Sequence, residues 1–172
     1  MLVQLDPGHG GVISGVYQTA GKRSPIWKDG SIYYEGEGNR DIVKRVAKKL
    51  DKLCIGYNYV VRPDDAKDVS LTTRIKDMNA KHKERGGKTF LISVHSDGFS
   101  DESANGMGVF VAPNASANSK KLADIMIKEM VNEFPQLKNR GVKTGNFAII
   151  RDSNCPAILL ESMFHTNEKE CR

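Results

Sequence analysis

Short apolar runs alternate with longer amphipathic segments along most of this chain, and this alternation constrains its fold more than any other feature. Apolar runs bounded by Gly, Pro or Asp are typical of buried strands, whereas apolar residues recurring every three or four positions are typical of helices. The pattern predicts strands at residues 2–5, 57–62, 90–94, 108–112, 147–150 and 157–160, and helices at 38–53, 71–85 and 119–134. We therefore expect one α/β domain, with a twisted, largely parallel sheet of about six strands flanked by helices.

Composition excludes several classes of protein. Of the 172 residues, 39% are hydrophobic and 27% are charged, an ordinary globular mixture. No apolar run approaches the roughly 20 residues that span a bilayer, so we expect no membrane insertion. The net charge of +5 would attract polyanions such as nucleic acid, anionic lipid or wall polymers, but much of it is better explained as the solvated face of the helix at 38–53. Because no nucleic-acid-binding motif accompanies that charge, we expect no nucleic-acid partner. Three cysteines without a CxxC pair predict reduced thiols.

Side chains suited to metal binding stand at the ends of the predicted strands. His9, His95 and Glu161 each follow an apolar strand, and Glu35 and Glu37 both stand just before the helix at 38–53. In parallel sheets, ligands bind beyond the carboxyl ends of the strands. Two imidazoles and one carboxylate can hold Zn²⁺ with an open coordination position, while a second carboxylate acts on water. The pattern predicts a metal-dependent hydrolase, and spacing alone does not choose between the two helix-mouth glutamates.

Each of these residues also has an ordinary structural interpretation. His9 would merely cap its turn, and His95 would be satisfied by hydrogen bonds at the edge of the core. If His95 binds metal instead, Asp97 and the backbone are the candidate partners of its other ring nitrogen. Glu161 would pair with a cation such as Arg151, since a buried carboxylate without a partner is costly. His165 follows closely, and we expect it to contact substrate or support the fold rather than bind metal.

Residues 10–34 form a long segment, rich in Gly and Ser, that carries Trp27, Tyr33 and Tyr34. No strand or helix is predicted there. A structureless segment of this length in a small domain is usually functional or mobile. We expect this aromatic-bearing loop to form one wall of a binding groove.

Several separate motifs, in order along the chain, resemble those of one enzyme family. The chain is similar, nearly end to end, to the zinc-dependent N-acetylmuramoyl-L-alanine amidases of the amidase-3 type, found in bacterial wall-remodelling enzymes and phage endolysins. The similar segments are LDPGHGG around His9, Glu35-x-x-x-Asn39, the segment Arg62…Asp65…Leu71-x-x-Arg74…Asn79, SVHSDG around His95, and the closing block NRGVKTGNFAIIRDSNCPAILLESMFHTNEKE.

The resemblance implies specific roles for four residues. His9, Glu35 and His95 would be the zinc ligands, with Glu35 favoured over Glu37, and Glu161 would be the catalytic acid–base. The implied substrate is peptidoglycan. The implied bond is the amide between the lactyl group of N-acetylmuramic acid and L-alanine of the stem peptide. Two alternatives stay open: a zinc peptidase acting within the stem peptide, and a non-catalytic wall-binding module.

The ends of the sequence add expectations about context. We expect residues 1–172 to form a catalytic domain that either lacks a final helix or continues past Arg172 into a helix and a wall-binding domain. The N-terminus shows no signal peptide, which favours synthesis in the cytoplasm. A phage lysin reaching the wall through a separate membrane-permeabilising partner is then favoured over an exported enzyme. A monomer is the expected oligomeric state.

Overall fold

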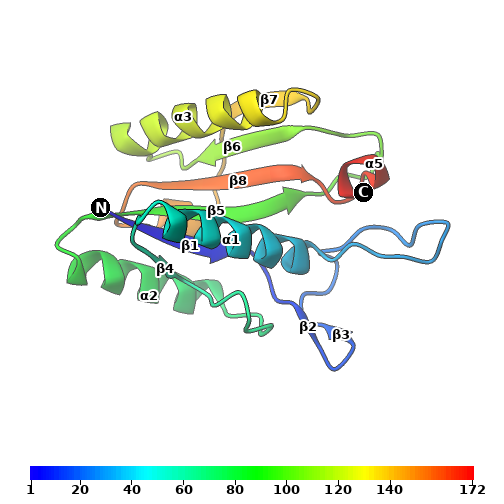
Figure 1. Cartoon of the computed structure of the whole chain (residues 1–172), viewed down its shortest axis with the longest axis horizontal. Coiled ribbons are helices and arrows are strands. Elements are labelled where there is room, and N and C mark those ends of the chain that lie inside the picture. Colours follow the sequence, from blue (N-terminus) through cyan, green and yellow to red (C-terminus); the bar gives the residue numbers. More distant parts are fainter.

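Six strands form one sheet in the order β4-β1-β5-β8-β6-β7 (Figure 1), in a computed structural model that describes all residues 1–172. Strand β1 is parallel to β4 and β5, and β5 is parallel to β8. Strand β6 is antiparallel to β8 and parallel to β7. The largely parallel α/β sheet is as predicted. The strands are β1 (Leu2–Pro7), β4 (Tyr57–Tyr59), β5 (Thr89–Asp97), β6 (Met107–Val111), β7 (Asn139–Thr144) and β8 (Ala157–Phe164).

Helices cover both faces of this sheet. On one face, α1 (Glu35–Lys52) and α3 (Ala117–Glu133) bury apolar side chains in a core cluster with β1, β5, β6 and β8. On the other face, α2 (Leu71–Glu84) and the short α4 (Ala148–Arg151) contribute Met78 and Ile149 to a second core cluster. A last turn, α5 (Glu168–Cys171), follows β8. Since side chains alternate along a strand, β5 and β8 contribute to both clusters.

The predicted strand at 147–150 is wrong. These residues lie mostly in helix α4, where Ile149 and Ile150 are both buried in the same core cluster. Neighbouring residues of a strand point to opposite faces, so only a helical turn lets both side chains enter one core. The sixth strand is instead β7, an edge strand whose residues are mostly exposed.

Several boundaries also differ from those predicted. The segment at 10–34 is not structureless, because it contains an antiparallel pair, β2 (Val12–Ile13) and β3 (Val16–Tyr17). Helix α1 begins at Glu35, three residues earlier than the predicted start. Strands β5 and β8 continue beyond their predicted ends, so that His95 and Glu161 lie within strands rather than after them.

Two expectations from composition can also be compared with the structure. Cys54, Cys155 and Cys171 are all free. None of the helices combines the length and the apolar character that a membrane crossing requires.

Candidate active site

The turn after β1 presents His9 to the site. His9 has a φ of 66°, in the left-handed region that residues with a Cβ rarely adopt. Its carbonyl oxygen accepts hydrogen bonds from Arg40 Nη1 at 2.7 Å and Arg74 Nη2 at 3.2 Å, which hold the turn in place. A Cβ on Gly8 would overlap the imidazole of His95. Glycine at that position therefore lets the two histidine rings approach, with their centroids 4.9 Å apart.

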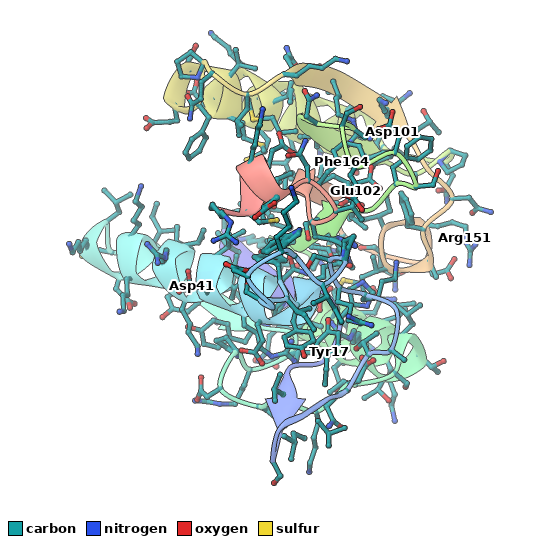
Figure 2. The ribbon with its side chains drawn as sticks, turned by 90° about the vertical axis from the view of Figure 1, so that its right-hand side faces the viewer. Tyr17, Asp41, Asp101, Glu102, Arg151 and Phe164 are labelled. Carbon is teal, nitrogen blue, oxygen red and sulfur yellow. The ribbon has the colours of Figure 1, made fainter.

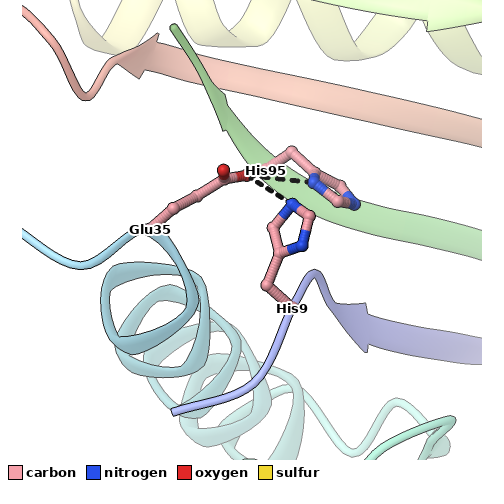
Figure 3. A group of neighbouring side chains, drawn as sticks. All are labelled: His9, Glu35 and His95. Atoms are coloured by element: carbon pink, nitrogen blue, oxygen red, sulfur yellow. Dashed lines mark hydrogen bonds and ion pairs between the residues drawn. The ribbon is translucent and has the colours of Figure 1, made fainter. Parts of the chain in front are cut away.

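The Glu35 carboxylate joins the two histidines (Figure 3). Its Oε1 atom lies 3.2 Å from His9 Nε2 and 3.1 Å from His95 Nδ1. The same oxygen accepts a hydrogen bond from the Ser96 backbone N–H at 3.2 Å. The Oε2 atom is buried without a hydrogen-bond partner, and His165 Nδ1 lies 3.7 Å from it. Burial favours a higher pKa, but hydrogen bonds from the two histidines hold the pKa of Glu35 well below its usual range.

These three side chains fit a zinc ion. One ligand atom from each of His9, Glu35 and His95 lies within 4.8 Å of the other two. Zinc–ligand bonds of 2.0–2.2 Å in tetrahedral geometry place neighbouring ligand atoms about 3.3 Å apart, close to the two contacts that Glu35 makes. By contrast, Glu37 Oε1 accepts a hydrogen bond from Val12 N–H at 2.6 Å, outside this cluster. The structure thus brings Glu35, and not Glu37, to both histidines.

Glu161 lies beside this cluster because of strand register. It is paired with His95 in the parallel β5–β8 ladder, which places the two side chains on the same face of the sheet. Glu161 is only 7% exposed, and its Oε2 atom has no hydrogen-bond partner. Burial, followed by the negative charges of Asp97 and Glu35, raises the pKa of Glu161 to about 9. Two buried carboxylates with unpartnered oxygens therefore indicate a place for a cation between them.

Two contacts considered from the sequence, Arg151 with Glu161 and Asp97 with His95, are not formed. Arg151 does not reach Glu161, since its guanidinium pairs with the Asp152 carboxylate at 2.7 Å. Asp97 does not support His95, since it accepts a hydrogen bond from Arg140 Nη2 at 2.7 Å.

All four predicted residues line one cleft of about 980 Å³. It lies on the α2 and α4 face of the sheet, between the first residues of these two helices. Phe110 and Phe147 line it too, with their ring centroids 5.3 Å apart at near right angles. The sequence analysis missed both. A signal was available for Phe110. Its neighbours in β6 enter the α1 and α3 core, so strand alternation places the Phe110 side chain on the opposite face of the sheet.

Of two other predicted features of the cleft, the loop differs from the expectation and His165 agrees with it. The loop at 10–34 reaches the cleft through residues 21–23, which include two cations, and not through its tryptophan. The Trp27 ring instead lies 5.3 Å from the Arg172 guanidinium. His165 lines the cleft but is buried, and its Nδ1 donates to the Ser96 carbonyl at 2.8 Å, a contact that supports the end of β5.

Comparisons with known proteins find similar sequences and similar folds. LytC of Bacillus subtilis (strain 168), an N-acetylmuramoyl-L-alanine amidase, is 29% identical over 167 residues, covering 96% of this chain and 30% of LytC. The N-acetylmuramoyl-L-alanine amidase of Clostridium difficile 630 is 29% identical, with a TM-score of 0.73 over 98% of this chain and 82% of that one. AmiC2 of Nostoc punctiforme is 26% identical, with a TM-score of 0.74 over 99% and 83%.

LytC is much longer than the matched region, and this chain spans 30% of its length. The family model for N-acetylmuramoyl-L-alanine amidases, in contrast, matches residues 3–172, almost the whole chain. This chain therefore belongs to the N-acetylmuramoyl-L-alanine amidase family.

Proposed function

We propose that this chain is a zinc-dependent hydrolase that cleaves the amide bond between N-acetylmuramic acid and L-alanine in peptidoglycan. The observation that carries the proposal is the convergence of His9, Glu35 and His95 on one point, beside Glu161, in one open cleft. Membership of the amidase family supports the identity of the bond. Residues 1–172 would then form the catalytic domain.

The chain's own donors define how the cofactor would be held. His9 Nε2, Glu35 Oε1 and His95 Nδ1 would be the ligand atoms. The Ser96 N–H donates a hydrogen bond to Glu35 Oε1 and holds this carboxylate in place. Two neutral imidazoles and one carboxylate are a common ligand set of catalytic zinc. The chemistry that zinc supplies when bound is Lewis acidity, which lowers the pKa of water from about 15.7 to about 7 and polarises an amide carbonyl.

Glu161 would move the proton during hydrolysis. As a water oxygen bonds to the carbonyl carbon, Glu161 accepts its proton, and when the carbon–nitrogen bond breaks, it returns that proton to the departing L-alanine amine. This role requires the ionised carboxylate. Burial opposes ionisation, so a cation held by the neighbouring donors would lower the pKa of Glu161 from about 9 towards the working pH.

Chelation tests the proposed metal dependence. We expect this protein to release soluble fragments from dye-labelled peptidoglycan, to lose that activity in a chelator, and to regain it when zinc is added back. His95→Ala should remove both bound zinc and activity. The matched control is His82→Ala, because His82 lies outside the cleft and contacts Thr89 Oγ1 at 2.8 Å. Sedimentation with the wall without release of fragments would indicate a binding module instead, and release that resists chelation would contradict the metal assignment.

A further inference from the structure

A second groove opens beside the cleft. It has a volume of about 450 Å³ and shares Asp97 and Phe99 with the cleft, so the two adjoin. Its other walls come from the loop before β6, from β7, and from Phe164 at the end of β8. Figure 2 looks onto this end of the sheet, with Phe164 near its centre. A substrate that reached from the cleft past Asp97 and Phe99 would enter this groove.

The groove is strongly basic. Lys138, Arg140 and Lys143 line it, and we call it the basic groove. The only acidic residue in its lining is Asp97, which is already paired with Arg140 at 2.7 Å. Both lysines are exposed, and neither forms an ion pair. Three cations thus face one carboxylate, and the lining has a surplus of positive charge.

Nearby acids are not part of this lining: the Glu170 carboxylate accepts hydrogen bonds from the Gly106 and Phe164 N–H groups, at 2.7 Å each. Asp101 and Glu102 lie on the loop that follows β5 (Figure 2), but neither lines the basic groove. The Asp101 carboxylate accepts a hydrogen bond from the Ser103 N–H at 2.8 Å, within its own loop.

Arg140 is held against Asp97 and Phe164 in the lining of the basic groove. Its guanidinium carbon lies 4.4 Å from the centroid of the Phe164 ring, and its side chain is 13% exposed. The Nη1 atom is buried without a hydrogen-bond partner, so Asp97 satisfies only part of the guanidinium. A cation fixed in this way loses little conformational entropy when an anion binds nearby.

We propose that the basic groove binds a carboxylate of the stem peptide, with Lys138 and Lys143 as the groups that contact it and Arg140 as a fixed charge behind them. This inference rests on the proposed function. A wall peptide carries carboxylates at its acidic residues and at its C-terminus, whereas the glycan on the other side of the scissile amide is largely neutral. The basic groove therefore sets the direction in which the peptide leaves the cleft.

Matched soluble substrates test this assignment. Three muramoyl peptides would be compared: one with free carboxylates, one with its acidic residue amidated, and one with its C-terminus amidated. We expect kcat/KM of the zinc-loaded wild type to fall about tenfold for one of the amidated peptides, the scale of a lost hydrogen bond to a charged group. The loss should appear in KM, as expected for binding that is uniform along the reaction. The affected peptide identifies which carboxylate is bound.

Two double variants complete the design. Lys138→Ala/Lys143→Ala should raise KM for the free peptide about tenfold and abolish the discrimination against the amidated one. Lys48→Ala/Lys52→Ala removes the same charge from the exposed face of α1, outside both the cleft and the basic groove, and should discriminate as the wild type does.

The possible outcomes separate this inference from the proposed function. Equal hydrolysis of all three peptides by the wild type would overturn the inference and leave the amidase assignment intact. The same holds if Lys138→Ala/Lys143→Ala discriminates normally. Failure of the wild type to hydrolyse any of the peptides would overturn the proposed function, and the inference with it.

Discussion

Replacing Glu161 with glutamine is expected to lower kcat on peptidoglycan by about 10³-fold, within the range of 10²–10⁴ typical of a general acid–base residue. Glutamine keeps the size of the side chain but cannot accept the proton of the attacking water. Because Glu161 lies beside the three proposed ligands and is not one of them, the variant should still bind one zinc ion. Metal analysis of the purified variant, together with its turnover, checks both statements.

The matched control is Glu37→Gln. Glu37 stands at the mouth of the same helix as Glu35, but its carboxylate binds Val12 N–H and does not line the cleft. This variant should keep nearly full activity. A Glu161→Gln variant that retained more than a tenth of wild-type kcat with zinc bound would contradict the role assigned to Glu161.

Replacing Arg74 with alanine is expected to lower the free energy of unfolding by about 3–5 kcal/mol, the cost of breaking a buried ion pair from one side. Arg74 is 3% exposed and donates to Asp6 Oδ1 at 2.8 Å, the Pro7 carbonyl at 2.7 Å and the His9 carbonyl at 3.2 Å. Its loss leaves the Asp6 carboxylate buried without a cation and frees the turn that carries His9. Urea unfolding of the metal-free protein measures the change.

Two further variants test whether the burial of Arg74 is the cause of the large loss of stability. Arg62→Ala removes an arginine whose side chain is 71% exposed, paired with Asp64 at 2.9 Å. That variant should lower the free energy of unfolding by no more than about 1 kcal/mol, which is the usual contribution of a surface ion pair. Arg74→Lys keeps the charge but loses the planar guanidinium that donates several hydrogen bonds at once. Its free energy of unfolding should therefore lie between those of the wild type and Arg74→Ala. A loss below about 1 kcal/mol for Arg74→Ala would show that the pair does not hold this turn.

The fold was largely predictable because most of its strands and helices have clear apolar periodicity. The exceptions have physical causes. Residues 147–150 form a short apolar run, and periodicity cannot tell such a strand from one turn of a buried helix. Strand β7 was missed because it is polar and lies at the edge of the sheet. Helix α1 begins before its predicted start at residue 38, and Gly36 in its first turn packs against the Gly10 carbonyl, too closely for any side chain.

The site was predictable to the extent that strand ends define it. His9, His95 and Glu161 could be placed together because their strands are neighbours in a parallel sheet. The hydrogen bonds from Arg40 and Arg74 to the His9 carbonyl could not be inferred, since these arginines lie 31 and 65 residues away from His9 in the sequence. The basic groove likewise depends on a strand that the pattern did not reveal. Contacts of this kind follow from the packing of distant segments, which local periodicity does not encode.

Mass spectrometry of purified peptidoglycan digested by the zinc-loaded protein tests the central claim most directly, because it identifies the bond that is cut. We predict intact stem peptides with a free L-alanine amine, and glycan strands whose lactyl groups end in a carboxylate. Products should appear with zinc and disappear with a chelator. New termini within the stem peptide, with the same zinc dependence, would contradict the amidase assignment and identify a zinc peptidase.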